Sequence, residues 1–428
     1  MLEVISMDER TQELVDFTRE KFGLWDYYLE TYSFNRSVNI FNETVYTMSM
    51  EWFPNHCVGQ AYEDENPDGT AVITIEVKSR NFESVIFVMG QTFATNGVTF
   101  TDKNDIIKWI ENETGLAFEE QFQLHKEEEG ELHFKECIDG IAVSPSGMIE
   151  VNFDQDGRLT LFSAHGHFPA KEMVKIEPFT LTFEKIEDIA KEQVKLIESP
   201  LMEQQRLVSA YAVEEIYVRN DQTATFPFEV IVDVRGYMKI DKTLEWDEPI
   251  GDSSFERKEI TWHEEVSAQQ AFSGEPSPDT LPISETEQEK CMIEVRDFLR
   301  RVYPSDSGVW LLKSLHRESG YIHAIVRANK QDKRVFQRKI NIMIDSESLQ
   351  AVNYMDNQMM LEMFDEFEEP EKVVISKNEA YEKIKEKFEL EPYYVYDFDH
   401  NQYVLCGKID CQFAVHASTG KVLPLDEL

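Results

Sequence analysis

Residues 376–416 read SKNEAYEKIKEKFELEPYYVYDFDHNQYVLCGKIDCQFAVH, and the first third of this stretch has the pattern of a helix. Ser376 and Glu379 have the spacing of a capping box, in which each side chain bonds the backbone N–H of the other residue. Ala380, Ile384 and Phe388 follow one another at i, i+4 and i+8 and therefore share a helical face. The stretch predicts an amphipathic helix with one buried side.

Strand patterns follow this helix. The runs YYVYDF, YVLCGKI and FAVHA are rich in β-branched and aromatic residues, and the polar segment DHNQ separates the first two. The chain then turns at Thr419 and Gly420. Alternation predicts that Tyr394, Tyr396 and Phe398 pack on the helix that precedes them. The whole stretch predicts a small unit of one helix followed by antiparallel strands.

The same order of helix and strands recurs along the chain. A stripe of Ile186, Ile189, Ala190, Val194 and Ile197 predicts a helix across TFEKIEDIAKEQVKLIES. Helix patterns followed by strand patterns also occur in TQELVDFTREKFG, TDKNDIIKWIENETG and CMIEVRDFLRRVYP. The fold class that we predict is α+β, with tandem small modules that each place a helix on a three- or four-stranded antiparallel sheet.

Two strand patterns show the alternation of a half-buried strand. The alternating apolar residues are Ile73, Ile75 and Val77 in the first, and Ile340, Ile342 and Ile344 in the second. The helix patterns that precede them are also alike, which indicates an internal duplication.

The module boundaries follow from these patterns and from one segment without them. The stretch from Trp262 to Lys290 contains several prolines and serines and little apolar periodicity, which is typical of a linker. The predicted division is 1–100, a helix-plus-sheet module; 101–178 and 179–262, two modules of one kind; 263–284, a linker; 285–365, a module resembling 1–100; and 366–428, a C-terminal module of the same kind as 101–178 and 179–262.

Composition excludes some classes of partner. The chain has 428 residues, 42% of them hydrophobic, so it can bury several cores without metals or disulfides. Its 82 acidic and 42 basic side chains give a formal charge of −40, which repels nucleic acid and anionic membranes. Basic proteins and loosely held divalent cations remain compatible with this charge, and so does a role in solubility alone.

The sequence predicts a cytoplasmic protein, unless an export signal was removed. The first residues, MLEVISMDERTQELVDF, lack the basic and apolar regions of a secretory signal, and no run of 18 apolar residues indicates a membrane span. The five cysteines are odd in number and form no CxxC pair. Free thiols in a reducing compartment are therefore favoured over a disulfide framework.

Two turn motifs carry a resemblance to a known family. The ending FAVHASTGKV and the double hairpin DGIAVSPSGMIEVNFDQDGRLTLF resemble the repeats of the YcdB/YcdC group of Firmicute proteins, which are similar to PepSY modules. The terminal motif of such modules has Asp where this chain has His416. The resemblance implies that the modules 101–178, 179–262 and 366–428 are PepSY-like. PepSY modules bind, and sometimes inhibit, peptidases, and the resemblance implies no catalytic residues and no cofactor.

Searches for catalytic motifs give no positive result. HEEVSA begins like the zinc motif HExxH, but Ser267 stands where the second His is required. P-loop, GxSxG and GxGxxG patterns do not occur. We therefore predict no catalytic residue and no cofactor, although an enzyme is not excluded.

His165 and His167 are the candidate metal ligands. Residues at i and i+2 of a strand project from one side, and imidazole is a good ligand for Zn, Ni or Cu. A third ligand cannot be placed from the sequence, and a polar strand end with two solvated imidazoles is the alternative. Asp154 and Asp156 superficially resemble a calcium loop, but a β-turn at Gly157 explains their spacing.

Cys406 and Cys411 would face each other if Gly407–Asp410 formed a hairpin loop. The alternative, which the predicted reducing compartment favours, is a pair of strand residues with free thiols.

These patterns predict a non-catalytic protein that binds or regulates a protein or peptide partner, with a peptidase as one such partner. The first alternative is a hydrolase or metal-dependent enzyme that uses His165 and His167 together with distant carboxylates. The second alternative is an oligomerising structural protein. The sequence identifies neither the partner nor the oligomeric state.

Overall fold

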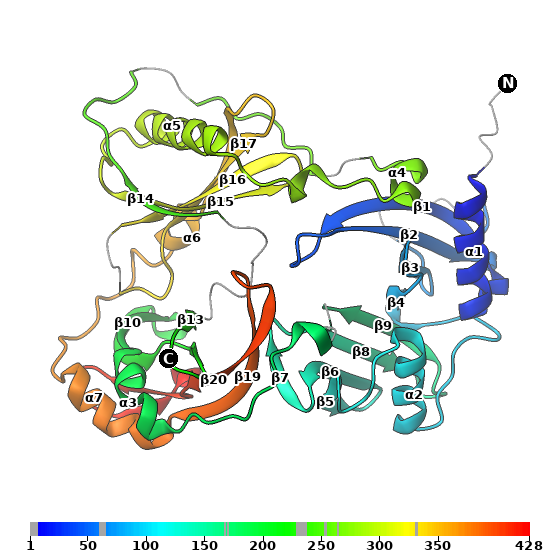
Figure 1. Cartoon of the computed structure of the whole chain (residues 1–428), viewed down its shortest axis with the longest axis horizontal. Helices are drawn as coiled ribbons and strands as arrows, with labels where there is room; N and C mark the ends of the chain where they lie inside the picture. Colours follow the sequence, from blue (N-terminus) through cyan, green and yellow to red (C-terminus); the bar gives the residue numbers. More distant parts are fainter. Residues whose placement is uncertain are drawn as a thin grey trace. The chain divides into compact units, whose positions relative to one another are not determined.

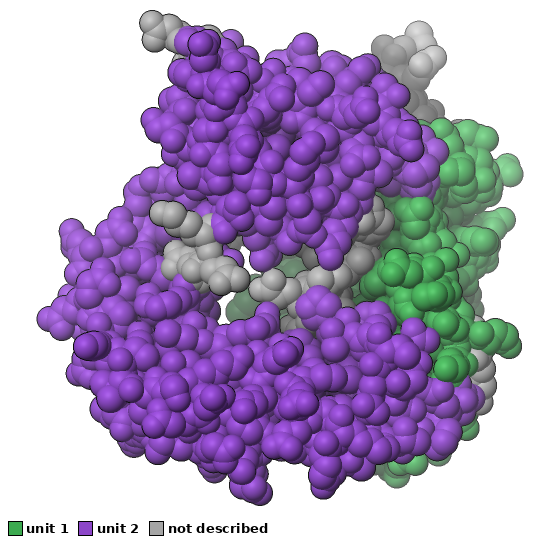
Figure 2. Space-filling model, turned by 60° about the vertical axis from the view of Figure 1, so that its left-hand side comes forward, with its two compact units in different colours: residues 1–175, 264–277, 394–404 green, residues 176–263, 278–393, 405–428 purple. Residues whose placement is uncertain are grey.

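The structure of the chain is a computed structural model. It describes residues 7–59, 66–166, 168, 171–227, 238–251, 255–262, 265–329 and 333–428. The chain forms two compact units (Figure 2). Unit 1 comprises residues 1–175, 264–277 and 394–404, and unit 2 comprises residues 176–263, 278–393 and 405–428.

Unit 1 is a sheet with helices on one face (Figure 1). Its helices are α1 (Glu9–Phe22), α2 (Lys103–Thr114) and α4 (Ala268–Ser273). Its strands are β1 (Tyr27–Val38), β2 (Thr44–Pro54), β3 (Ala71–Glu76), β4 (Phe82–Phe87), β5 (Phe122–Glu128), β6 (Glu131–Ile138), β7 (Ile141–Ser144), β8 (Met148–Phe153) and β9 (Leu159–His165).

The strands of unit 1 pair in the order β1-β2-β3-β4-β9-β8-β6, and β5 and β7 both pair with β6. All of these pairs are antiparallel. The core lies between the sheet and the helices α1 and α2, because alternate residues of each strand pack against Leu14 and Phe22 of α1 and Ile106 and Ile110 of α2. The helices α1 and α2 cover this face of the sheet only, so the opposite face is left without a helix.

Unit 2 contains more than one sheet. Its helices are α3 (Phe183–Glu192), α5 (Glu285–Val302), α6 (Gln358–Glu362) and α7 (Lys377–Ile384). Its strands are β10 (Val194–Leu201), β11 (Arg206–Val213), β12 (Ile216–Arg219), β13 (Thr225–Pro227), β14 (Met238–Leu244), β15 (Trp310–Glu318), β16 (Tyr321–Ala328), β17 (Lys339–Asp345), β18 (Ala351–Asp356), β21 (Phe413–His416) and β22 (Val422–Pro424). The residues of β19 (Glu389–Asp397) and β20 (Gln402–Asp410) are divided between the two units.

Each group of strands in unit 2 has a helix that fills its core. The antiparallel sheet β14-β15-β16-β17-β18 packs on α5 through side chains such as Val295 and Leu299. The sheet β10-β11-β21-β22 packs on α7 through Ala380 and Ile384, and β12 packs on α3. The predicted α+β class is confirmed by this mixture of helices and antiparallel strands.

The helix predicted after residue 376 is confirmed, and so is its cap. The backbone N–H of Ser376 donates to Glu379 Oε2 at 2.7 Å, and the backbone N–H of Glu379 donates to Ser376 Oγ at 3.3 Å. These two bonds satisfy groups that a helix start otherwise leaves open. Ala380 and Ile384 are buried, as their spacing predicts, but α7 ends at Ile384 and Phe388 has an extended backbone.

The helix predicted across residues 182–199 is too long. α3 ends at Glu192, where the side-chain amide of Gln193 donates to the carbonyl of Ile189 at 3.1 Å. Val194 and Ile197 belong instead to β10, which pairs with β11 over eight consecutive residues. Tertiary pairing therefore outweighs the helical spacing of these two residues.

A further prediction about side chains is wrong. The ring of Tyr396 packs on Tyr403 and Phe41, with centroids 5.0 and 5.2 Å apart, and not on the helix α7. Gly407 and its neighbours form no hairpin loop, since β20 continues without interruption to Asp410. Cys406 lies within β20 and Cys411 directly follows its last residue, and both side chains are buried.

Two predicted turns are confirmed. Asp154 Oδ1 accepts from the backbone N–H groups of Asp156 and Arg158 at 2.9 Å each, so the Asp-Gly segment is a turn between β8 and β9. At the C-terminal hairpin, the backbone N–H of Ser418 donates to His416 Nδ1 at 3.3 Å. The imidazole thus accepts the bond that an Asp carboxylate makes in such turns.

The segment predicted as a linker contains packed residues. α4 begins at a capping box formed by Ser267 and Gln270, and Ala271 is buried in the core of unit 1. The module boundaries from 1–100 to 366–428 stay predictions, because the division into two units does not test them. No helix in the described ranges combines the length and the apolar character that a membrane span requires.

The core face of unit 1 can be tested with two isoleucines. Ile73 on β3 is 0% exposed, whereas Ile86 on the neighbouring β4 is 38% exposed. Ile73→Ala should lower the free energy of unfolding by about 2–5 kcal/mol, because it leaves a cavity. Ile86→Ala should lower it by less than about 1 kcal/mol. Denaturant titration measures both, and an equal or larger loss for Ile86→Ala would mean that the opposite face is the buried one.

Candidate binding face

The sheet of unit 1 has one face that its helices do not cover. We call this face, formed by the side chains that alternate with the core residues of β1 to β6, β8 and β9, the open face. Its side chains are mostly half-buried by their neighbours on the sheet, and Ile86 and Met148 are exposed. The open face is therefore available for contact along most of the sheet.

A row of polar side chains crosses the open face. Its members lie directly opposite one another on successive strands, and they are Ser33, Ser49, Thr74, Ser84, Ser163, Glu150 and His133. The first five are hydroxyl residues, each of which can both donate and accept a hydrogen bond. The row, which we call the hydroxyl row, therefore offers hydrogen-bonding groups to a ligand that lies across the strands.

The neighbouring row is apolar at its centre. Its members, again in direct register, are Glu51, Val72, Ile86, Leu161, Asn152 and Glu131. An apolar strip beside a strip of hydroxyls suits a ligand that has both apolar and polar groups along its length.

The open face is negatively charged. Its carboxylates are Glu51, Glu76, Glu128, Glu131 and Glu150, and its ammonium groups in the described part of the sheet are Lys126 and Lys135. Lys126 forms an ion pair with Glu128 at 2.9 Å. A cationic ligand is therefore favoured over an anionic one.

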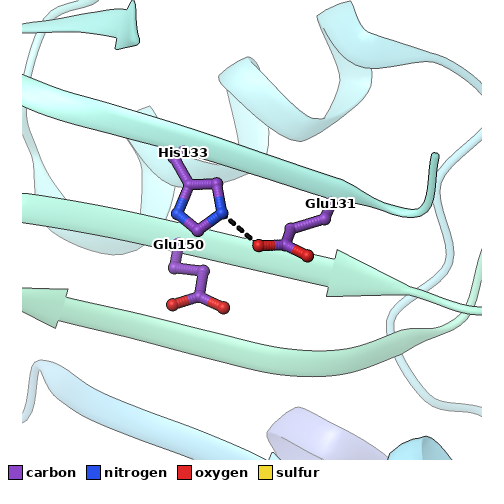
Figure 3. A group of neighbouring side chains, drawn as sticks. All are labelled: Glu131, His133 and Glu150. Atoms are coloured by element: carbon purple, nitrogen blue, oxygen red, sulfur yellow. Dashed lines mark hydrogen bonds and ion pairs between the residues drawn. The ribbon is translucent and has the colours of Figure 1, made fainter. Parts of the chain in front are cut away.

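Three metal-ligating side chains meet at one end of these rows (Figure 3). Glu131 and His133 project from the same side of β6, and Glu150 lies opposite His133 on β8. One ligand atom of each residue lies within 4.8 Å of the other two, and all three residues are half-buried. His133 Nε2 contacts Glu131 Oε1, and Glu150 Oε1 accepts from the amide of Asn152 at 3.2 Å.

The structure places His165 on the same face but outside this group. His165 is the exposed last residue of β9, opposite Met148, and His167 lies outside the described residues. The use of these two histidines as a metal site stays a prediction. The group of Glu131, His133 and Glu150 was missed, because the spacing of Glu131 and His133 is visible in the sequence but the register of β6 with β8 is not.

Unit 1 also buries a carboxyl group. Glu136 is 1% exposed, and its Oε2 accepts from the backbone N–H of Gly147 at 2.6 Å. Burial raises the pKa of Glu136 to about 7, against the lowering effect of that hydrogen bond. Burial likewise raises the pKa of Tyr403, and the charge of Glu136 adds to this rise. The pair is enclosed and offers no surface to a ligand.

Unit 2 contains a stacked pair of buried histidines. His316 and His323 are directly opposite on β15 and β16, with ring centroids 5.0 Å apart. The Nδ1 of His323 bonds the side-chain amide of Asn341, and burial lowers the pKa of His323, with His316 adding to the effect. Within the described chain, no other His, Cys or carboxylate completes a three-ligand group with them.

Comparisons with known proteins do not assign the chain to a family. No family model matches it, and no curated protein matches it. The solved structure of the Bacillus megaterium YpeB C-terminal domain matches with a TM-score of 0.24 and 9% sequence identity, over 81% of this chain and 96% of that chain. At this TM-score the match does not define the fold, which follows from the chain's own register and packing.

The buried Glu136 predicts a pH-dependent stability. Because its pKa is about 7 in the folded state and 4.5 as an ordinary side chain, the folded protein binds a proton that the unfolded chain has lost between these values. Stability should therefore fall as the pH rises through this window. Glu136→Gln removes this pH dependence. The free energy of unfolding of Glu136→Gln, relative to that of the natural chain, should increase by about 2 kcal/mol between about pH 5.5 and about pH 8.

Urea titration at the two pH values measures this difference. Exposed Glu129→Gln is the matched control and should show no such growth. If the free energies of unfolding of Glu136→Gln and the natural chain differ by the same amount at both pH values, Glu136 is ionised in the folded protein over this whole range.

Proposed function

We propose that this chain is a non-catalytic binding protein that holds an extended basic segment of a partner protein across the open face of unit 1. The observation that carries the proposal is the hydroxyl row, in which side chains of neighbouring strands stand in direct register from β1 to β6. Such a row presents hydrogen-bonding groups at the regular spacing of the strands.

The dimensions of the row suit a peptide. From β2 to β6 the row crosses six strands, and neighbouring strands are about 4.8 Å apart, so it is roughly 24 Å long. An extended chain advances about 3.3 Å per residue, which gives a footprint of about seven residues. The apolar strip of Val72, Ile86 and Leu161 runs beside it and provides contacts for the side chains of such a segment.

The charge of the chain supports a basic partner. The formal net charge is −40, and carboxylates outnumber ammonium groups on the open face. Such a surface attracts Lys and Arg side chains and repels phosphate groups. Hydroxyls and apolar groups then supply the contacts that survive when salt screens the charges.

The proposal has three finer features: tandem modules, a peptidase as the partner and action in the cytoplasm. Helices that each fill the core of a group of antiparallel strands support an array of tandem helix-on-sheet modules. The resemblance to PepSY modules adds a peptidase as the partner whose access or activity is regulated. We propose that the chain acts in the cytoplasm, since five cysteines without a CxxC pair suit a reducing compartment.

A peptide display library tests the proposal with defined probes. The natural chain should select peptides that are rich in Lys and Arg and that bind at moderate salt. Ser84→Arg places a cation in the middle of the hydroxyl row. It should lower the affinity for those peptides by more than roughly tenfold, because like charges in an interface repel. Ser163→Arg, at the next position of the row, should have the same effect.

The control is Ser305→Arg, which makes the same change at an exposed turn of unit 2 and should leave the affinity unchanged. The circular dichroism spectra of all three variants should match that of the natural chain. The proposal is wrong if no peptide is selected, or if the selected peptides bind Ser84→Arg and Ser163→Arg as tightly as the natural chain.

A further inference from the structure

The group of Glu131, His133 and Glu150 has the donor atoms of a transition-metal site. It offers one imidazole nitrogen and two carboxylates, a set that suits Zn²⁺ and related divalent ions better than Ca²⁺, which takes oxygen ligands alone. The three residues come from paired strands, so the backbone fixes their relative positions. A site on strands is held more rigidly than a site on loops.

The two carboxylates of this group are only partly balanced by nearby cationic side chains. Among the described residues, neither Glu131 nor Glu150 forms an ion pair with a lysine or an arginine. The ammonium group of Lys126, opposite His133, also acts on the charge of Glu131, but its ion pair is with Glu128. Two half-buried carboxylates that meet around one imidazole therefore attract a further cation.

The spacing is compatible with one ion. Ligand bonds to Zn²⁺ are about 2.0–2.2 Å long, so ligand atoms around it are at most about 4.4 Å apart. The three ligand atoms lie within 4.8 Å of one another, and rotation of the two flexible glutamate side chains brings them to the separation that Zn²⁺ requires. Three protein ligands leave a coordination position free on the side of the open face.

We propose that Glu131, His133 and Glu150 bind one divalent transition-metal ion of the Zn²⁺ class at the end of the hydroxyl row. Asn152 orients the site, because its amide donates to Glu150 and its Cα lies opposite Glu131. The site differs from the pair His165 and His167, and it does not depend on the proposed binding of a peptide.

Isothermal titration of the EDTA-treated full chain with Zn²⁺ tests the assignment. The natural chain should bind one ion at this site. His133→Ala and Glu150→Gln should each weaken binding by at least roughly 100-fold, because loss of an outer partner alone costs 10–100-fold. His165→Ala is the matched control, since it removes an imidazole from the same face and should leave the affinity unchanged.

A second readout is the visible absorption of Co²⁺, whose intensity reports the coordination geometry. The Co²⁺ spectrum of the natural chain should be lost in His133→Ala and kept in His165→Ala. Thermal unfolding of the metal-free variants checks that each one folds. Ser84→Arg should keep the Zn²⁺ site, which separates a failure of peptide binding from a failure of this assignment.

Three results would overturn the assignment. The first is the absence of binding by the natural chain. The second is an affinity that His133→Ala and Glu150→Gln leave unchanged. The third is a loss of Zn²⁺ affinity in His165→Ala as large as that in His133→Ala, which would place the ion near the end of β9.

Discussion

The register of the strands in unit 1 is the constraint on which the rest depends. Side chains alternate between the two faces of a strand, so a slip of one residue would exchange the core face with the open face. The core holds the register in place, because Met50, Ile73 and Val85 lie directly opposite one another under the helices. The same register brings Thr74 and Ser84 together on the other side. The open face is thus a consequence of how the core packs.

Local features of the fold were predictable because their causes lie within a few residues. The cap at Ser376, the Asp-Gly turn after β8 and the alternation at Ile73 are all fixed by neighbours in the sequence. The end of α3 was not predictable in this way, because Val194 has the spacing of a helix and the environment of a strand. Its partner strand, β11, supplies the hydrogen bonds that decide the outcome.

The candidate site could be predicted only in part, because it depends on contacts between distant segments. Ser84 and Ser163 are adjacent on the sheet but 79 residues apart in the chain. His133 and Glu150 likewise meet through the pairing of β6 with β8. The sequence does show Glu131 and His133 at i and i+2, the same spacing that drew attention to the histidine pair near the end of β9. Spacing alone could not show which of the two pairs has a third ligand.

The reactivity of an introduced thiol tests most directly whether the open face is accessible. All five native cysteines are buried, so the background reaction is slow. The account predicts that Ser84→Cys and Ile86→Cys react with an aqueous thiol reagent in the folded protein, Ile86→Cys faster because it is more exposed, whereas Ile73→Cys reacts only on unfolding. A basic peptide selected from the display library should slow the modification of Ser84→Cys and Ile86→Cys. Protection of Ser84→Cys and Ile86→Cys in the chain alone, equal to that of Ile73→Cys, would show that the face is covered and would contradict the account.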